Sequence, residues 1–332
     1  MKEGTFKIEI ITPTIMGGAD SKELDSLKIR PSEIKAMMRY VFRAIAGKFV
    51  DHKNIEQLLK AEGEIFGDTS KKSDFKIILS DTENLKDENI KLLPHKSNFQ
   101  KKAVMPNQFF NLTIIANKYD LEFYKSLLNL AFLIGIGNRR NRLNGNLQIN
   151  YDLNFASDIQ TVSNLCKNLL NTEEIKTNNP QFPSFTLRED GKKNYFVYSM
   201  RLKKDYSKDL QKNKFENLLI PLYKEVIHEI EKGPYKDLLG YVSTKENPKP
   251  TPRQASFVNF SIQKVGKDSY RLFLICFYYE NKNNKNENKN NKNNKNNKNF
   301  YYENKENKNF DYKTWKEGVE KIRELTEKTF KE

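Results

Sequence analysis

The chain has 332 residues and a net charge of +15 at neutral pH. This length is sufficient for two domains of ordinary size. A positive excess of this size favours polyanionic partners such as nucleic acids, although it does not indicate a fold. Residues 281–309 hold eight lysines and three glutamates and so supply +5, which leaves +10 on the rest of the chain.

The cysteines, the N-terminal residues and the lengths of the apolar runs argue against several classes of protein. Cys166 and Cys276 lie in apolar surroundings with no cysteine or histidine at metal-ligand spacing, so we expect buried, reduced thiols. The first residues lack the apolar core of a signal peptide. No run approaches the roughly 18 apolar residues of a membrane span. We therefore expect a cytoplasmic protein without a metal or another cofactor.

The first half of the chain predicts four strands and two helices. Residues 6–11 alternate in polarity like a half-buried strand. Pro31 and Ser32 begin a helix whose apolar residues recur at helical spacing; they are Ile34, Met37, Met38, Val41, Phe42 and Ile45. Further strands are expected at 75–79, 109–116 and 147–151, and a helix at 120–134. The order β-α-β-β-α-β is that of a ferredoxin-like or RRM-like domain, which leaves one sheet face uncovered.

The second half predicts a decorated copy of the same fold. We expect a strand at 194–200, a helix at 215–230, a hairpin of residues 254–265 and 269–279 around Gly266, and a helix at 311–330. Residues 281–299 contain only asparagine, lysine and one glutamate, a composition typical of a disordered loop. The prediction is an α+β protein with two ferredoxin-like domains, residues 1–152 and 153–332.

A glycine-rich and arginine-rich turn follows the second predicted helix; we call residues 135–145 the glycine–arginine loop. Its glycines are Gly135, Gly137 and Gly145, its arginines Arg139, Arg140 and Arg142, and its asparagines Asn138, Asn141 and Asn144. Glycines permit a positive φ and close approach to a ligand, and guanidinium and amide N–H groups suit phosphate oxygens. The spacing matches neither a Walker motif nor a dinucleotide fingerprint. A structural turn capped by Gly135 is the alternative.

The first predicted helix carries a matching basic flank. Lys35, Arg39 and Arg43 are four residues apart, beside the apolar face, and Arg30 directly precedes the helix. Such a stripe could bind phosphates along one nucleic-acid strand. The alternative is a solvated flank with acidic neighbours from elsewhere in the fold, since Glu33 is the single acid between Arg30 and Arg43.

Several of these segments resemble one known family. Residues 11–20 (ITPTIMGGAD) and 29–44 (IRPSEIKAMMRYVFRA) are similar to the N-terminal signature of Cmr subunit one, a RAMP-superfamily protein of type III-B CRISPR effector complexes. The glycine–arginine loop, residues 65–70 (IFGDTS) and residues 253–256 (RQAS) resemble further elements of that family, in the same order.

The resemblance implies two RRM-like domains and a non-catalytic RNA-binding role. Such a subunit would hold the 3′ part of the crRNA, help engage the 5′ part of the target RNA and contact other Cmr subunits, while base pairing supplies specificity. The residues expected to contact RNA are Gly17, Gly18, Arg30, Lys35, Arg39, Arg43, Gly137, Asn138, Arg139, Arg140, Arg142 and Arg253.

Two alternatives remain open at this point. Asp20 and Asp25 lie in the loop after the first strand, and in related RAMP subunits a loop aspartate cuts target RNA with a metal, which would make this chain an endoribonuclease. His52, His95 and His228 lie in no catalytic motif. The other alternative is a protein-docking scaffold that contacts RNA only incidentally.

Overall fold

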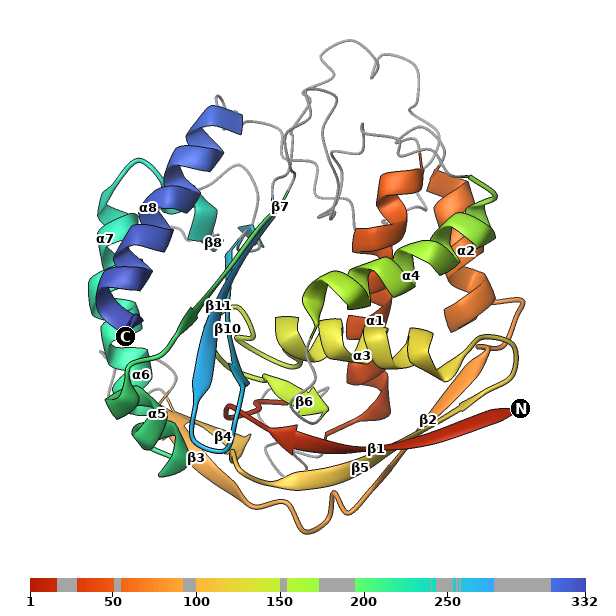
Figure 1. Ribbon diagram of the computed structural model, residues 1–332, viewed down its shortest axis with the longest axis horizontal. Helices are drawn as coiled ribbons and strands as arrows, with labels where there is room; N and C mark the ends of the chain where they lie inside the picture. The colour runs from red at the N-terminus through yellow and green to blue at the C-terminus, as the bar shows by residue number, and fades with distance from the viewer. Residues whose placement is uncertain are drawn as a thin grey trace.

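Figure 1 shows the computed structural model of the chain. The structure describes residues 1–16, 29–50, 55–91, 100–149, 154–172, 195–239, 241–242, 253–254, 256, 258–277 and 312–332. Gly17, Gly18, Asp20, Asp25 and the segment 281–309 lie outside these ranges.

The first sheet has four strands in the order β2-β5-β1-β6. These are β1 (Lys2–Ile10), β2 (Phe75–Ser80), β5 (Phe109–Ala116) and β6 (Leu147–Ile149). β5 is antiparallel to β1 and β2, and β1 is antiparallel to β6. With α1 (Pro31–Ala46) after β1 and α3 (Leu121–Ile134) after β5, this is the predicted βαββαβ arrangement.

The sequence of α1 determines which of its faces is buried. Pro31 occupies the first turn, where its missing N–H has no helical partner to lose. Every apolar residue that predicted the helix is buried. These side chains pack against Ile8 and Ile10 of β1 in the first hydrophobic core. The basic flank therefore lies at the edge of the buried face, as the spacing predicts.

Three features that pack on or beside the first sheet were not predicted. They are α2 (Ile55–Phe66), the hairpin of β3 (Asp87–Lys91) and β4 (Gln100–Val104), and α4 (Phe155–Leu170). Asn154 caps α4 by accepting a hydrogen bond from the Ser157 backbone N–H at 3.2 Å. α4 follows residue 152, yet its Val162, Cys166 and Leu170 pack into the first core.

The second half contains a three-stranded antiparallel sheet in the order β10-β11-β7. Its strands are β7 (Tyr195–Arg201), β10 (Val258–Lys264) and β11 (Tyr270–Phe277). Its helices are α5 (Lys204–Gln211), α6 (Glu216–Pro221), the π-helical turn η2 (Leu222–Ile227), α7 (His228–Lys232) and α8 (Tyr312–Phe330). Shorter elements are η1 (Gly47–Phe49), η3 (Lys236–Leu239), β8 (Tyr241–Val242) and β9 (Arg253–Gln254). The three strands of this sheet and the helices α6–α7 and α8 follow the predicted strand–helix–strand–strand–helix order, whereas α5, η3, β8 and β9 were not predicted. Lys331 bridges Leu202 just after β7.

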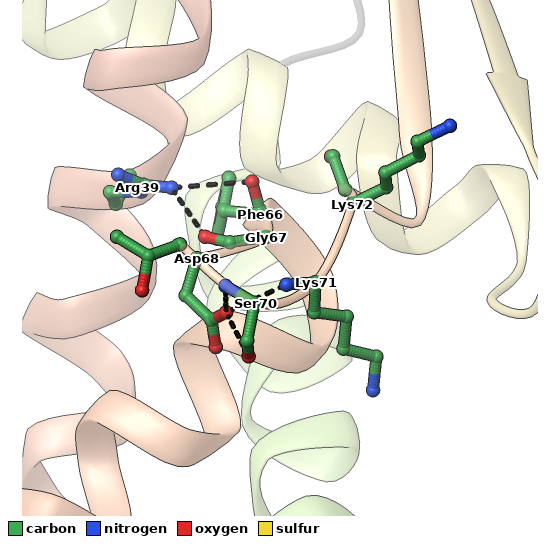
Figure 2. Close-up of a pocket in the computed structure, with 9 residues that line it drawn as sticks. Arg39, Phe66, Gly67, Asp68, Ser70, Lys71 and Lys72 are labelled. Carbon is green, nitrogen blue, oxygen red and sulfur yellow. Dashed lines mark hydrogen bonds between the residues drawn. The ribbon is translucent and has the colours of Figure 1, made fainter.

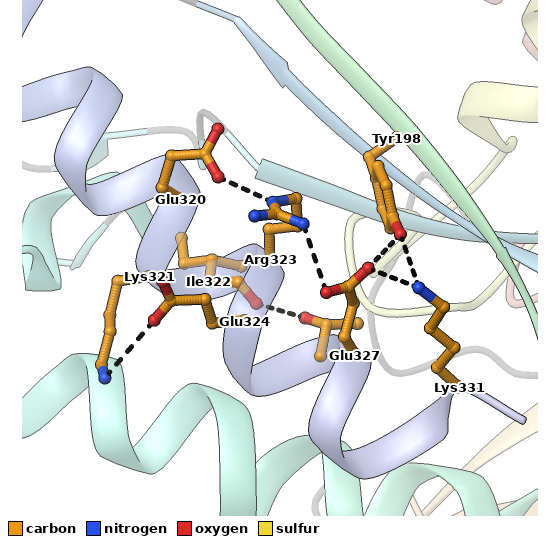
Figure 3. A network of polar contacts seen from close by, with 9 residues as sticks. Tyr198, Glu320, Lys321, Ile322, Arg323, Glu324, Glu327 and Lys331 are labelled. Atoms are coloured by element: carbon orange, nitrogen blue, oxygen red, sulfur yellow. Dashed lines mark hydrogen bonds and ion pairs between the residues drawn. The ribbon is translucent and has the colours of Figure 1, made fainter.

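Polar contacts fasten α8 across β7 (Figure 3). Glu327 accepts hydrogen bonds from Tyr198 of β7 and, at 3.1 Å, from Lys331. Arg323 lies between Glu327 and Glu320, with its guanidinium 3.2 Å and 2.7 Å from the two carboxylates. This network is formed at the surface, and it orients the helix whose apolar side enters the second core.

The second sheet is buried on both faces. Leu272, Leu274 and Cys276 of β11 belong to the second core, while Phe273 and Ile275 from the same strand belong to the first. Figure 1 shows this sheet between α8 and α7 on one side and α3 and α4 on the other. Since a strand alternates its side chains between faces, β11 contributes to both cores at once. Cys166 and Cys276 are both buried and free, as expected.

Side-chain amides join the two halves where β6 meets β10. Asn146 Oδ1 accepts from the Ile262 N–H at 3.0 Å. Gln148 accepts from the Lys264 N–H at 2.9 Å and donates to the Lys264 carbonyl at 2.7 Å. Lys264 also forms an ion pair of 2.7 Å with Glu9, and both side chains are almost fully buried. The two sheets are thus connected by hydrogen bonds as well as by apolar packing.

Candidate nucleic-acid interface

The glycines of the glycine–arginine loop serve the packing of the loop itself. Gly135 ends α3 with φ of +95°, and its N–H donates to the Ala131 carbonyl. At Gly137 (φ +74°) a Cβ would lie 2.3 Å from the Ile15 carbonyl oxygen, and at Gly145 (φ +73°) 1.9 Å from that of Ile136. These positions require glycine because the backbone passes so close to neighbouring carbonyls. The close approach at Gly137 is therefore to the chain's own backbone.

The three arginines of the loop point to three different parts of the molecule. Arg139 Nη1 donates to the Tyr223 hydroxyl at 3.2 Å, in the second half of the chain. The Arg140 guanidinium lies 5.5 Å from the centroid of the Tyr40 ring and donates to the Met37 sulfur at 2.8 Å, both on α1. Arg140 thus connects the loop to the helix with the basic flank.

The side chain of Arg142 is held by hydrogen bonds within the protein. Its guanidinium donates to the carbonyls of Asn141 and Leu239, both at 3.0 Å, and contacts the Ser256 hydroxyl at 3.4 Å. Burial lowers the pKa of Arg142. A buried guanidinium that satisfies several carbonyls holds the joint between the halves, so the phosphate contact predicted for it has to compete with these bonds. Asn138 is exposed, and its N–H donates to the Ile15 carbonyl at 2.8 Å.

The basic flank of α1 has an acidic neighbour that the sequence did not reveal. Glu62 of α2, whose side chain is 7% exposed, lies 3.2 Å from Arg39 and accepts two hydrogen bonds from Arg43. One carboxylate therefore faces two guanidinium groups, and the cluster keeps a positive excess. The apolar residues of α2 recur at helical spacing, so this helix, and with it the position of Glu62, could have been predicted from the sequence. It was not.

The other flank residues are also engaged. Arg30 pairs with Glu33 at 2.9 Å. The Lys35 ammonium lies 5.2 Å from the centroid of the Phe75 ring. Burial, together with the charge of Arg39, lowers the pKa of Lys35. All four predicted residues lie along α1 and its start, at least partly exposed to solvent.

An open pocket of about 770 Å³ lies between Arg39 and residues 66–73. Arg39 Nη2 donates to the carbonyls of Phe66 at 3.3 Å and Gly67 at 3.1 Å. Asp68 accepts from the Ser70 and Lys71 N–H groups and so shapes the turn. Figure 2 shows Arg39 directed at the two carbonyls, with the Lys71 side chain directed away from it. The two backbone carbonyls of this turn therefore fix the orientation of the Arg39 guanidinium.

Among the described residues, the glycine–arginine loop and α1 are in contact. The loop meets α1 where the Arg140 guanidinium lies over the Tyr40 ring. Gly17 and Gly18 lie outside the described residues, and Arg253 lies in β9, paired with Val242, with its side chain outside the described part. In the described ranges no group of three or more histidine, cysteine, aspartate or glutamate side chains is arranged to hold a metal ion. None of the helices in those ranges is long and apolar enough to cross a membrane.

Comparison with known proteins gives consistent similarities. A model of the RAMP superfamily matches residues 7–147. The CRISPR system Cmr subunit Cmr1-2 of Pyrococcus furiosus is 39% identical over 90 residues, which are 27% of this chain and 46% of that protein. The match thus spans about half the length of the curated relative.

Solved structures resemble the chain over a greater length. The apo crystal structure of Cmr1 from Pyrococcus furiosus has a TM-score of 0.51 and 18% identity, covering 84% of this chain and 89% of that one. A chain of a type III-B Cmr-β complex bound to cognate target RNA has a TM-score of 0.49 and 12% identity, covering 97% and 98%. The first part of the chain thus resembles the RAMP superfamily, and the fold of the chain is similar to that of the apo Cmr1 structure.

Proposed function

We propose that this chain is an RNA-binding subunit of a type III-B CRISPR (Cmr) effector complex in the cytoplasm. It holds the 3′ part of the crRNA, helps engage the 5′ part of the target RNA and contacts neighbouring Cmr subunits. In this role the protein binds the RNA backbone, and pairing between guide and target supplies the sequence specificity.

The observation that carries this proposal is the junction of two basic elements at Arg140. The glycine–arginine loop and α1 are separated by about ninety residues, yet Arg140 contacts Tyr40 and Met37 of α1. The contact places an arginine of the loop against the helix that carries the basic flank, and arginines from neighbouring elements suit the regularly spaced phosphates of a single strand. The net charge of +15 supports the same conclusion. The sequence match to Cmr1-2 supports the assignment to a Cmr complex.

A salt series tests RNA binding by the full-length chain. Affinity for single-stranded RNA should fall steeply with salt, with a slope of about −0.7 per phosphate contact. The double variant Arg139→Ala/Arg140→Ala should reduce the slope by the amount expected for the loss of one to two phosphate contacts. Lys208→Ala/Lys232→Ala, which removes the same charge from exposed positions on α5 and α7, is the matched control. A slope near zero for the wild type would favour the docking scaffold instead.

The proposed role is non-catalytic, and a separate experiment tests whether this chain takes part in cleavage. Target-RNA cleavage should be measured with the reconstituted complex carrying Asp20→Ala/Asp25→Ala. We expect unchanged cleavage. Loss of cleavage with intact RNA binding would identify this chain as a RAMP endoribonuclease.

A further inference from the structure

Residues 141–143 of the glycine–arginine loop are hydrogen-bonded to the second half of the chain. The Leu143 N–H donates to the Phe260 carbonyl at 3.2 Å, and the Phe260 N–H to the Asn141 carbonyl at 3.4 Å. Arg142 extends this connection to the Leu239 carbonyl. The conformation of the loop therefore depends on both halves of the protein, although all of its residues belong to the first.

Arg139 is the loop arginine whose orientation depends most directly on a side chain of the second half. It adopts φ of +58°, in the left-handed region, and its carbonyl accepts the Arg142 N–H at 2.9 Å. Its guanidinium donates to the Tyr223 hydroxyl at 3.2 Å. A single hydrogen bond to a charged group can select one rotamer of a long, flexible side chain.

Tyr223 lies in an unusual segment. It belongs to the π-helical turn Leu222–Ile227, directly after Pro221, within an otherwise α-helical stretch. π-turns shift side chains relative to a regular helix and occur frequently at functional sites. Leu222 and Val226 of this turn are buried in the second core, so the backbone that carries Tyr223 is held rigidly. The half-buried tyrosine thus provides a fixed acceptor for Arg139.

We propose that Tyr223 is a positioning residue of the RNA site, which holds Arg139 for contact with an RNA phosphate. This inference rests on the proposed RNA binding. It makes the site a composite of both halves, with α1 and the loop from the first half and the π-turn from the second. Tyr223 acts through Arg139 and, in this proposal, is not itself required to contact RNA.

The test is a double-mutant cycle on the full-length chain, with single-stranded RNA binding measured across a salt series. Arg139→Ala should weaken binding about tenfold near 0.1 M salt and reduce the slope by about 0.7. Tyr223→Phe keeps the ring and removes the hydroxyl, and should weaken binding about three- to tenfold with a similar loss of slope. In the Arg139→Ala background Tyr223→Phe should have no further effect.

Three readouts separate this inference from its alternatives. Tyr206→Phe, which removes a hydroxyl from a ring that packs on Phe330 of the same half, is the matched control and should leave binding unchanged. If Arg139→Ala weakens binding but Tyr223→Phe does not, or if the two effects simply add, the positioning role is wrong. If the wild type shows no salt-dependent RNA binding, the proposed function itself fails.

Discussion

The guanidinium of Arg140 lies 5.5 Å from the centroid of the Tyr40 ring. This contact joins a loop and a helix that the sequence presents as two separate basic elements. A guanidinium over an aromatic ring gains cation–π attraction and loses rotamer freedom, so the pair orients the arginine as well as stabilising it. Val41 and Phe42, the next two residues after Tyr40, are fully buried and cannot replace it.

The Tyr40 ring should therefore matter for RNA binding. Tyr40→Leu should weaken binding of single-stranded RNA about threefold, because Arg140 loses its ring and samples more rotamers. Tyr40→Phe keeps the ring and should bind like the wild type. Equal affinities for Tyr40→Leu and the wild type in fluorescence anisotropy would show that the contact does not orient Arg140.

Replacing Glu62 should affect stability and RNA affinity in opposite directions. Glu62→Gln leaves Arg39 and Arg43 without their shared carboxylate and should lower the free energy of unfolding by about 1–2 kcal/mol, less than for a fully buried pair because both arginines are partly exposed. The same change frees positive charge, so RNA affinity and its salt slope should increase.

Glu64→Gln is the control for Glu62, since Glu64 lies on the same helix and pairs with Lys71 at the surface. Its effect on denaturant unfolding should stay below about 0.5 kcal/mol. A loss of both stability and RNA affinity in Glu62→Gln would mean that the carboxylate orients the two arginines for RNA.

Arg142 should be intolerant of lysine. A lysine ammonium cannot reproduce a planar fork that reaches the Leu239 carbonyl and the Ser256 hydroxyl together. Arg142→Lys should lower the free energy of unfolding by about 2 kcal/mol in urea denaturation. Arg271→Lys, at an exposed position of β11, should be nearly neutral. Equal stability of the two variants would contradict the structural role of Arg142.

Asp158 should give a pH-dependent stability difference. Burial raises its pKa, while hydrogen bonds from Ser126 and Asn129 oppose the shift. A carboxyl with a raised folded pKa favours folding below its unfolded pKa of about 3.9, and this contribution is lost as the pH rises through the folded pKa. Asp158→Asn should therefore be about 0.5–1 kcal/mol more stable than the wild type at pH 7.

That difference should shrink below about pH 4, where the wild-type carboxyl is protonated as well. Thermal unfolding at pH 7 and pH 3.5 measures it. Asp205→Asn, at a position almost fully exposed on α5, is the control and should show no such dependence. A lower stability of Asp158→Asn at both values of pH would mean that hydrogen bonding outweighs burial at this site.

The first ferredoxin-like unit was largely predictable. α1 carries clear periodicity, and its burial follows it. β1 alternates in sequence, but Ile8, Glu9 and Ile10 are all buried, because Glu9 pairs with Lys264 of the second half. Two features on either side of β2 in the chain were not predicted: α2 before it and the β3–β4 hairpin after it. Hairpin residues such as Lys101 and Lys102 are polar and give little alternation, so their pairing is decided by the partner strand rather than by local preference.

The sequence by itself determined the clustering of glycine and arginine after α3 and the basic flank of α1, because both are local patterns of spacing and residue type. It could not determine which of these arginines have partners within the protein. Arg142 is engaged by carbonyls almost one hundred residues away, and Arg43 by Glu62 of a neighbouring helix. Those partners meet only when the chain is packed, since the energy of a buried charge depends on the groups that surround it in space.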